Sequence, residues 1–534
     1  MNLPSAPQTV DRTVVTLGEA PLGIDDVENV ALGHARIELS DTPEVAARLA
    51  RGAAVLEVLL ASGRRVYGVN TGFGDSCETD VPAEHRLDLP HNLIRFHGCG
   101  TGASFSPVEA AAIAVTRLAS LVSGASGVRP VLIERLCQLV NHRLLPKIPC
   151  EGSVGASGDL TPLSYLAAAL LGERELLLET GEVLPASLVL ERLGPFRLSP
   201  KESLALMNGT SAMTGLACLA FQRARRLGRF AAALTAVASD VMRGQPGHFD
   251  DRLFSLKPHP GQRACAGWIR DDLGSPPATP SNAAARPVTP ARLQDRYSLR
   301  CAPHVIGVLL DNLPHARAVI ETELNSTNDN PVLDLETGEV LHGGNFYGGH
   351  ICQAMDTLKT CIANLADLCD RQLALLCDSR TNGGLPDNLV LDRAPSQHGF
   401  KAMQISASAL CAEALKLTMP ASVFSRSTEN HNQDKVSMGT IAARDCLRIL
   451  DLTETVAAIH ALALCQAVDL RSAMSCCPRA RELHAAVRRQ VAVNTTDRRM
   501  DLDIAAVLEL YRERKLPLGS ADFPPPRSSV RGKP

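Results

Sequence analysis

Residues 152–160 read GSVGASGDL, a run of small residues followed by a threonine, a proline and an apolar stretch. Ala156, Ser157 and Gly158 lie between a glycine-rich lead-in and the expected start of a helix, so the backbone can turn unusually tightly there. In such a turn the amide nitrogen of Gly158 can reach the carbonyl carbon of Ala156 and close a five-membered ring. Loss of water from Ser157 would then leave an exocyclic methylidene, an electrophile made from the chain itself. Taken alone, however, an Ala-Ser-Gly tripeptide is an ordinary turn in most proteins.

The composition favours packed helices. Of the 534 residues, 45% are hydrophobic, 21% are charged and only 3% are aromatic, which argues against a β-sandwich or barrel. Several proline-poor stretches are longer than an average helix of about 12 residues. They cover residues 203–241, 301–324, 351–379, 401–418 and 435–470. We therefore expect a mainly α protein built on a bundle of long helices.

The charge balance excludes two classes of partner. Lys and Arg number 54 and Asp and Glu 57, so a formal net charge of −3 creates no global field for nucleic acid or for an anionic membrane. The start of the chain lacks a basic flank and an apolar signal core, which predicts a cytoplasmic protein. The 16 cysteines are spread over apolar stretches without a CxxC pair, so we expect reduced core thiols and no metal site.

Capping patterns predict where three helices begin. Thr42 precedes a proline, as is typical of a cap followed by a first-turn proline. Ser106 and the glutamate three residues later have the spacing of a capping box, and the periodicity of the helix that follows leaves Arg117 off its apolar face. Thr161 is expected to cap the helix behind the small-residue run, with a proline in its first turn.

Glycine and proline mark the expected loops. Residues 66–74 read VYGVNTGFG, and three glycines in so short a loop let its backbone approach a ligand closely. Residues 274–290 contain five prolines among small polar residues, which predicts a mobile surface loop. Residues 523–534 predict a disordered tail.

Several segments, in a fixed order between about residues 40 and 470, resemble the histidine and aromatic amino acid ammonia-lyases. Residues 152–160 resemble the segment in which this family forms 4-methylideneimidazol-5-one, usually called MIO, and residues 67–74 resemble its catalytic tyrosine loop. The other matching segments are LALMNGT at 204–210, QDRYSLRC at 294–301, NDNP at 328–331, GGNF at 343–346 and NQD at 432–434.

The resemblance implies a fold and an assembly. The expected fold is the long-helix bundle of the fumarase/aspartase-like ammonia-lyases with a smaller N-terminal region that bears the cofactor. Residues 1–215 would form that N-terminal region, residues 216–485 the central bundle, and residues 486–534 the C-terminal helices and tail. Members of the family are tetramers whose active sites combine loops from several subunits, so a homotetramer is expected.

The resemblance also implies roles for individual residues. MIO would form from Ala156, Ser157 and Gly158 and would take the substrate amine, which makes the nitrogen a better leaving group. Tyr67 would remove the β-proton, although a phenol with a pKa of about 10 needs nearby positive charge or oriented dipoles to act as a base at neutral pH. Arg300 would form a bidentate pair with the substrate carboxylate.

Further positions follow from the resemblance alone. Tyr297 and Asn208 would orient the amine and the cofactor oxygen by hydrogen bonding. The remaining site positions of the family fall on Asp159 and Phe346 beside the cofactor and on Asn330 and Gly74 beside the substrate.

The identity of the amino acid depends on Phe96, His97 and Gln433. The family's selectivity pair is Ser-His in histidine lyases, His-Leu in typical tyrosine lyases and Phe-Leu in plant-type phenylalanine lyases, and Phe96-His97 matches none of them. Gln433 stands where histidine lyases usually have a glutamate, which favours an aromatic substrate. Because His97 offers a polar partner to a phenol hydroxyl, we expect L-tyrosine, giving p-coumarate and ammonia.

Other functions stay open at this point. Phenylalanine would give cinnamate and histidine would give urocanate. An aromatic 2,3-aminomutase would use the same residues and return ammonia to the β-carbon. A catalytically dead helical scaffold would keep the fold without the reaction.

Overall fold

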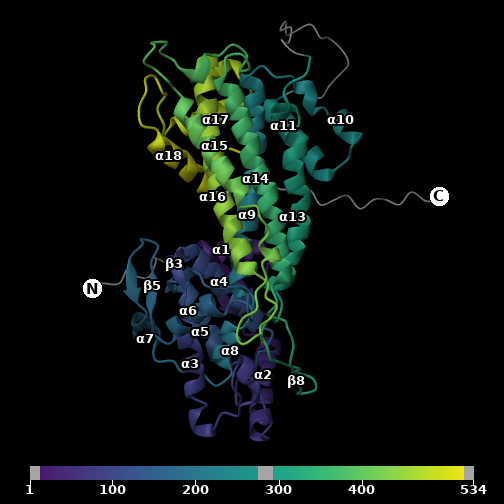
Figure 1. Ribbon diagram of the computed structural model, residues 1–534, viewed down its shortest axis with the longest axis vertical. Helices are drawn as coiled ribbons and strands as arrows, with labels where there is room; N and C mark the ends of the chain where they lie inside the picture. Colours follow the sequence, from purple (N-terminus) through teal and green to yellow (C-terminus); the bar gives the residue numbers. More distant parts are fainter. Residues whose placement is uncertain (1–11, 275–292, 522–534) are drawn as a thin grey trace, which may run out of the picture. The chain divides into compact units, whose positions relative to one another are not determined.

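The computed structural model describes residues 12–274 and 293–521 (Figure 1). The chain divides into two compact units. The first comprises Met1–Gln222, Ala316–Asp356 and Pro420–Arg444, and the second Arg223–His315, Thr357–Met419 and Asp445–Pro534. Helices with residues in both units are α9 (Ser211–Val241), α13 (Ala302–Leu324), α14 (Gly349–Cys377) and α16 (Gly439–Arg471). These long helices confirm the prediction of a mainly α fold.

The first unit contains shorter helices around a buried centre. Helix α4 packs against α1 and α5, and α3 packs against both α6 and α8. The helices are α1 (Ile24–Ala31), α2 (Pro43–Ala61), α3 (Asp88–Phe96), α4 (Pro107–Leu121), α5 (Pro130–Asn141), α6 (Leu160–Leu170), α7 (Ser187–Leu193) and α8 (Glu202–Met207), with 3₁₀ turns η1 (Gly74–Glu78), η2 (Ala83–His85) and η5 (Ala421–Val423).

Strands in the described part of the chain pair only as two-stranded sheets. Strand β1 (Thr13–Leu17) lies parallel to β2 (Ala35–Leu39). The antiparallel pairs are β3 (Thr101–Ser104) with β4 (Pro149–Glu151), β5 (Glu175–Leu177) with β6 (Val183–Pro185), and β7 (Val332–Leu333) with β8 (Val340–Leu341). The β3–β4 pair brings the end of the Phe96-His97 segment beside the strand that leads into residues 152–160.

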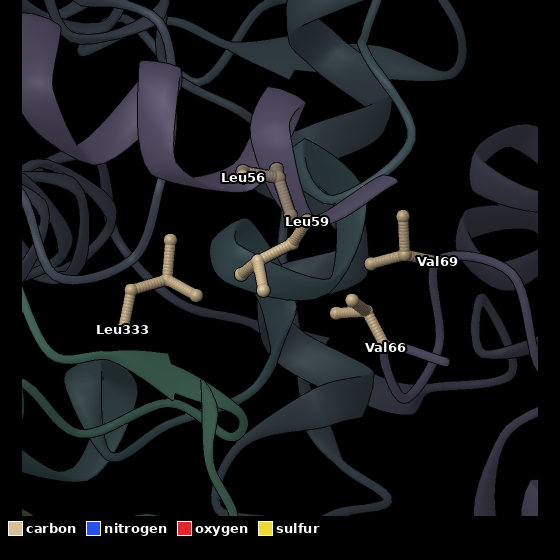
Figure 2. Close-up of a cluster of buried hydrophobic side chains, with 5 residues drawn as sticks. All are labelled: Leu56, Leu59, Val66, Val69 and Leu333. Atoms are coloured by element: carbon tan, nitrogen blue, oxygen red, sulfur yellow. The ribbon is translucent and has the colours of Figure 1, made fainter. Parts of the chain in front are cut away.

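A small apolar cluster anchors the loop that carries Tyr67. Figure 2 shows Leu56 and Leu59 of α2, Val66 and Val69 of the loop and Leu333 of β7 gathered around one point. All five side chains are buried, with exposed fractions of 7% or less. Burying side chains of this size stabilises a fold by about 1.5–3 kcal/mol each. The cluster therefore fixes the backbone on both sides of Tyr67.

The second unit is built on the long helices. Within it, Thr235 of α9 accepts a hydrogen bond of 2.9 Å from Gln372 of α14, and Arg223 of α9 pairs with Glu454 of α16 at 2.8 Å. The remaining helices of the unit are α10 (Asp251–Ser255), α11 (Pro260–Leu273), α12 (Tyr297–Arg300), α15 (Lys401–Lys416), α17 (Pro478–Arg488) and α18 (Asp501–Arg512), with 3₁₀ turns η3 (Pro246–Phe249), η4 (Asp387–Leu389) and η6 (Ala473–Ser475).

The predicted helix starts are only partly confirmed. Ser106 accepts from the backbone of Glu109, whose carboxylate accepts from the Ser106 backbone, as in a capping box. Thr42 occupies the cap position, but its hydroxyl lies 3.0 Å from that of Ser40 and does not bond to the helix. The prediction that Thr161 caps the next helix is wrong, because Asp159 takes the cap position and α6 begins at Leu160, two residues before the predicted start.

Arg117 is the largest departure from the sequence pattern in this unit. Periodicity placed it off the apolar face of α4, yet its side chain is fully buried. Helix α4 is enclosed on nearly all sides, so a side chain off the apolar stripe still lies in the interior. The physical reason is that the guanidinium is hydrogen-bonded inside the protein, as described below.

The predictions for the cysteines, the loops and the domain boundaries have different outcomes. All 16 cysteines are free thiols and most are buried, as the apolar surroundings in the sequence indicate. Residues 275–290 of the predicted mobile loop and the predicted disordered tail lie outside the described residues. The predicted boundaries after residues 215 and 485 stay a prediction. No helix within residues 12–274 and 293–521 is long and apolar enough to cross a membrane.

Candidate active site

The Ala-Ser-Gly segment forms a tight left-handed turn. Ser157 has a φ of +48° and Gly158 a φ of +81°, and a non-glycine residue in this region is uncommon. The amide of Gly158 donates to the carbonyl of Gly155 at 3.2 Å, which closes the turn. A Cβ at Gly158 would collide with the carbonyl of Gly209, so only glycine fits there.

A short backbone pairing holds this turn against the segment that follows α8. Gly209 donates its amide to the carbonyl of Ser157 at 3.1 Å, and Asp159 donates its amide to the carbonyl of Gly209 at 2.7 Å. Asn208 is thereby placed next to the turn. Its side chain is 3% exposed, and among the described residues its Oδ1 finds no hydrogen-bond partner. A buried amide oxygen of this kind is costly unless a further group meets it.

Asp159 is a fully buried carboxylate at the start of α6. Its Oδ2 accepts a hydrogen bond of 2.8 Å from the amide of Met213, and its Oδ1 accepts one from the hydroxyl of Thr440. Burial raises the pKa of Asp159 to about 6, and these hydrogen bonds oppose the rise. The side chain therefore ties together the starts of α6, α9 and α16 beside the turn.

Arg117 holds the neighbouring Asn208 segment by hydrogen bonds. Its guanidinium donates to the carbonyl of Asn208 at 2.9 Å and to Oδ1 of Asn328 at 2.9 Å. The amide of Asn328 donates in turn to the hydroxyl of Thr210 at 2.9 Å. Burial lowers the pKa of Arg117 to about 10, opposed by the carboxylates of Asp329 and Asp159, so the group stays charged at neutral pH. These contacts fix the Asn208 segment from both sides.

A buried ion pair positions the NDNP segment. Lys201 and Asp329 lie 2.8 Å apart, and both side chains are fully buried. The next residue, Asn330, accepts a hydrogen bond of 2.8 Å from the amide of Gly343. Phe346 follows in the same loop and is half-buried. No hydrogen bond or ring contact between Phe346 and the Ala-Ser-Gly turn is present in the described residues.

We expect Lys201→Met to destabilise the protein by about 3–5 kcal/mol, because it leaves the carboxylate of Asp329 buried without a counter-charge. Urea unfolding followed by circular dichroism measures the effect. Replacing both partners, as in Lys201→Met with Asp329→Leu, should restore most of the loss. The matched control is Lys416→Met, at the exposed end of α15. Equal midpoints for Lys201→Met and the control would contradict the role given to this pair.

Gln433 reaches the turn directly. Its Nε2 lies 3.2 Å from Oγ of Ser157, and its Oε1 accepts from the hydroxyl of Thr428 at 3.0 Å. Because Oε1 is occupied by a donor, the amide presents its N–H to Ser157. Between Thr428 and Gln433 the chain makes a compact loop in which Glu429 has a φ of +52°. Such strained loops occur where a side chain must be held in one place.

The loop that carries Tyr67 is joined to the Gln433 loop by a hydrogen bond of Asp75. The hydroxyl oxygen of Tyr67 accepts a bond of 2.7 Å from the amide of Gly74. The carboxylate of Glu429 accepts from the amide of Asp75 at 2.9 Å, which brings the tyrosine loop and the Gln433 loop together. Burial raises the pKa of Tyr67, the Gly74 N–H opposes this, and the Glu429 carboxylate adds to the rise. A tyrosine base needs positive charge or oriented dipoles near its hydroxyl, and the Gly74 N–H supplies one such dipole.

Phe96 and His97 lie at the end of α3. The Nδ1 atom of His97 lies 3.0 Å from the carbonyl of Leu93 and must carry the proton, because a carbonyl can only accept. Burial lowers the pKa of His97, so the ring is neutral at pH 7 with its Nε2 lone pair free to accept. The Phe96 ring lies against it at 4.2 Å and is 59% exposed.

Tyr297 and Arg300 belong to the second unit. They form the one-turn helix α12, in which the Arg300 guanidinium lies over the Tyr297 ring, 4.7 Å from its centroid. Tyr297 is 72% exposed. They are therefore not among the side chains that the first unit gathers around Ser157. Asp159, Asn208 and Gln433 lie at the turn, and Tyr67 and Gly74 are linked to the Gln433 loop through the bond between Asp75 and Glu429.

Several supporting residues were missed by sequence reasoning. Arg117 and Thr440 bond to Asn208 and Asp159, while Thr210 and Glu429 bond to neighbours of the candidate residues, and the sequence patterns gave none of the four a role in the site. An arginine within an alanine-rich helix was the available signal for Arg117, because an isolated charge in such a helix needs buried partners. Within residues 12–274 and 293–521, no group of three or more His, Cys, Asp or Glu side chains is arranged to hold a metal.

Known proteins match this chain over most of its length. The profile described as aromatic amino acid lyase matches residues 22–489. A tyrosine ammonia-lyase of Cereibacter sphaeroides is 40% identical over 501 residues, which are 91% of this chain and 95% of that protein. A histidine ammonia-lyase of Aromatoleum aromaticum is 38% identical over 497 residues, 93% of each protein. The solved structure of a tyrosine aminomutase from Streptomyces globisporus has a TM-score of 0.87 at 34% identity and covers 94% of this chain and 98% of its own.

The resemblance inferred from the motifs is thus confirmed at the level of the family. The two relatives from Cereibacter sphaeroides and Aromatoleum aromaticum are both named ammonia-lyases, while their names differ in the amino acid. The chain belongs to the aromatic amino acid lyase family and is a carbon–nitrogen lyase.

Proposed function

We propose that the protein converts L-tyrosine to p-coumarate and ammonia with MIO formed from Ala156, Ser157 and Gly158. The observation that carries this proposal is the left-handed turn at Ser157 and Gly158, held by Gly209 and contacted by Gln433.

The residues present fit the cofactor. The missing Cβ of Gly158 is what allows its backbone to lie against Gly209, and the buried Asn208 Oδ1 atom beside the turn has no partner among the residues that the structure describes. When formed, MIO supplies an electrophilic methylidene for the substrate amine. Asn208 and Asp159 hold the backbone around the ring, and Phe346 is proposed to line its surroundings.

Other roles fall to side chains with observed contacts. Tyr67 removes the β-proton, and its hydroxyl is held in place by the Gly74 N–H. The Gln433 N–H donates toward Ser157 Oγ, the oxygen that leaves as water during ring formation. Arg300 binds the substrate carboxylate with its planar fork, with Tyr297 and Asn330 completing the pocket.

The His97 tautomer supports tyrosine as the substrate. Because Nδ1–H is engaged by the Leu93 carbonyl, Nε2 is an acceptor, and a phenol hydroxyl is a suitable donor for it. Phenylalanine would leave that acceptor desolvated and unpaired, which costs free energy. The relative from Cereibacter sphaeroides, named a tyrosine ammonia-lyase, points in the same direction.

The direct test is incubation of the protein with tyrosine, phenylalanine and histidine in separate reactions. The ultraviolet spectra of p-coumarate, cinnamate and urocanate distinguish the three products. Because the neighbouring structure from Streptomyces globisporus is a tyrosine aminomutase, β-tyrosine must be sought by chromatography in the same reactions. A larger kcat/KM for phenylalanine or histidine than for tyrosine would overturn the substrate assignment, and accumulation of β-tyrosine would replace the lyase by a mutase.

We expect His97→Phe to lower kcat/KM for tyrosine by about 10–100-fold. This factor corresponds to the loss of one buried hydrogen bond that contributes about 1.4–3 kcal/mol. The value for phenylalanine should hold or rise, because the added ring offers apolar contact. Steady-state kinetics with both substrates measures the ratio. His85→Phe, at an exposed histidine of η2, is the control that should leave the ratio unchanged. An unchanged ratio in His97→Phe would remove His97 from the specificity pocket.

We also propose that the protein is a homotetramer in which Arg300 and Tyr297 complete sites with residues of other chains. Light scattering should give four times the chain mass. Mixing an inactive Ser157→Ala chain with an inactive Arg300→Ala chain during refolding should restore part of the activity. Failure of every mixture to recover activity, with tetramers present, would contradict shared sites.

A further inference from the structure

Arg174 has a backbone conformation that favours glycine. It lies between the end of α6 and the start of β5, and its φ of +71° is in the left-handed region that other residues rarely adopt. Its carbonyl accepts a hydrogen bond of 2.8 Å from the amide of Ala186, so the conformation belongs to ordered backbone. A strained conformation of this kind persists where the surrounding contacts determine it. At this position the side chain makes contacts that glycine could not make.

The side chain of Arg174 lies between α6 and the main chain that follows His97. Its guanidinium lies over the ring of Tyr165, 4.4 Å from the ring centroid. It also donates a long hydrogen bond of 3.4 Å to the carbonyl of Gly98. The Tyr165 ring is buried in α6, and a planar guanidinium stacks well on such a ring face. The stack therefore supports the guanidinium where it meets Gly98.

Gly98 is fitted to this contact. A Cβ at Gly98 would collide with the guanidinium of Arg174, so the space that another residue would need is already filled. The amide of Gly98 donates to the carbonyl of Arg95 at 3.2 Å, which ties it to the last turn of α3. Arg174 thus contacts the residue directly after His97.

A second contact joins the same two segments. Arg95 of α3 donates to the carboxylate of Glu173, the neighbour of Arg174, at 2.8 Å. Helices α3 and α6 also pack against each other. Because α6 begins directly after the Ala-Ser-Gly turn, contacts at its other end fix the His97 segment relative to that turn.

We propose that Arg174 is a positioning residue for substrate selection: it holds the main chain beside His97 so that the Nε2 acceptor keeps one position, which raises the preference for tyrosine over phenylalanine. This role rests on the proposed function. A hydrogen bond weakens steeply when its geometry is lost, so movement of the segment weakens the bond to a phenol hydroxyl. The ring of phenylalanine has no such bond to lose.

Arg174→Gly removes the side chain and suits the observed φ. The ratio of kcat/KM for tyrosine to kcat/KM for phenylalanine should fall by about 3–10-fold, less than in His97→Phe because the imidazole remains. Arg174→Asn, whose side chain also tolerates the left-handed region, should lower the ratio similarly. Arg143→Gly is the matched control, because Arg143 has a φ of +54° but pairs with Glu179 at 2.7 Å. The ratio in this control should stay unchanged.

A double variant distinguishes positioning of His97 from a general loosening of the site. If Arg174 acts through His97, adding Arg174→Gly to His97→Phe should leave the ratio of His97→Phe within about twofold. Circular dichroism and thermal unfolding of each variant verify the fold. Effects that multiply in the double variant, or an unchanged ratio in both folded Arg174 variants, would overturn the role of Arg174.

Hydrogen–deuterium exchange of the whole protein gives a readout that is independent of the reaction. Amides of residues 95–101 should exchange about 3–10-fold faster in Arg174→Gly than in the wild type, and they should not do so in Arg143→Gly. Unchanged exchange in this segment would show that Arg174 does not hold it. A wild type inactive with both amino acids would refute the proposed function and this role together, whereas an active wild type with an unchanged ratio in Arg174→Gly would refute this role alone.

Discussion

Ser157→Ala is expected to lower kcat for the preferred amino acid by at least about 10³-fold, a loss of about 4 kcal/mol in transition-state stabilisation. Ring formation needs two dehydrations: one as the Gly158 nitrogen joins the Ala156 carbonyl carbon, and one as the Ser157 side chain loses its hydroxyl. Alanine has no hydroxyl to lose, so the methylidene cannot form. The backbone should be little changed, because the side chain of Ser157 bonds only to Gln433 among the described contacts.

Two measurements besides activity check this result. Intact mass of the wild-type chain should fall short of the sequence mass by two waters, and denatured protein should keep a near-ultraviolet absorbance that Ser157→Ala lacks. Ser62→Ala, at an exposed serine after α2, serves as the control and should retain both signatures. Wild-type turnover in Ser157→Ala would refute the proposed mechanism, and an unmodified wild-type mass would favour the dead-scaffold alternative.

The second large effect is expected at Tyr67. Tyr67→Phe should lower kcat by about 10²–10⁴-fold, the usual contribution of a positioned general base, with a smaller change in KM. The substitution also leaves the Gly74 N–H without its acceptor at 2.7 Å. Tyr165→Phe is the matched control, since that hydroxyl makes one longer bond of 3.4 Å to Gly100.

The pH dependence separates a base from a structural hydroxyl. Burial raises the pKa of Tyr67, so the phenolate is the minor form at neutral pH and its fraction grows about tenfold with each pH unit below that pKa. The kcat of the wild type should therefore increase from pH 7 to pH 9, and the residual kcat of Tyr67→Phe should not show that increase. Parallel profiles for the two proteins would assign Tyr67 to a structural role.

Local sequence chemistry predicted the parts of the fold that depend on neighbouring residues. The capping box at Ser106 forms where serine and glutamate place it. The predicted start of α6 was two residues too late, because the cap residue Asp159 is bonded to Met213 and Thr440, which lie far away in the sequence. Spacing along the chain carries no information on such contacts.

The candidate site divides in the same way. The Ala-Ser-Gly turn and the Tyr67 loop could be predicted from the sequence because glycine allows conformations that other residues avoid. The bond from Gln433 to Ser157 and the buried Arg117 were not, because both depend on tertiary packing. Motif resemblance predicted that Gln433 belongs to the site, and the structure gives its hydrogen-bond direction. How Tyr297 and Arg300 meet a substrate depends on other chains in the proposed tetramer.

The contacts of the Ala-Ser-Gly turn determine that folding of the first unit comes before ring formation in the proposed chemistry. The partners that clamp it come from later in the sequence: Gly209 supplies the backbone pairing, Gln433 follows 276 residues after Ser157, and Thr440 follows 281 residues after Asp159. A growing or unfolded chain has none of these contacts in place. On the proposed chemistry, ring closure waits until the first unit has been completed by residues 420–444, so a nascent chain carries no reactive group that could capture cellular amines or thiols. The presence of the ring would then show that a molecule has folded at least once, since an unfolded nascent chain cannot form it.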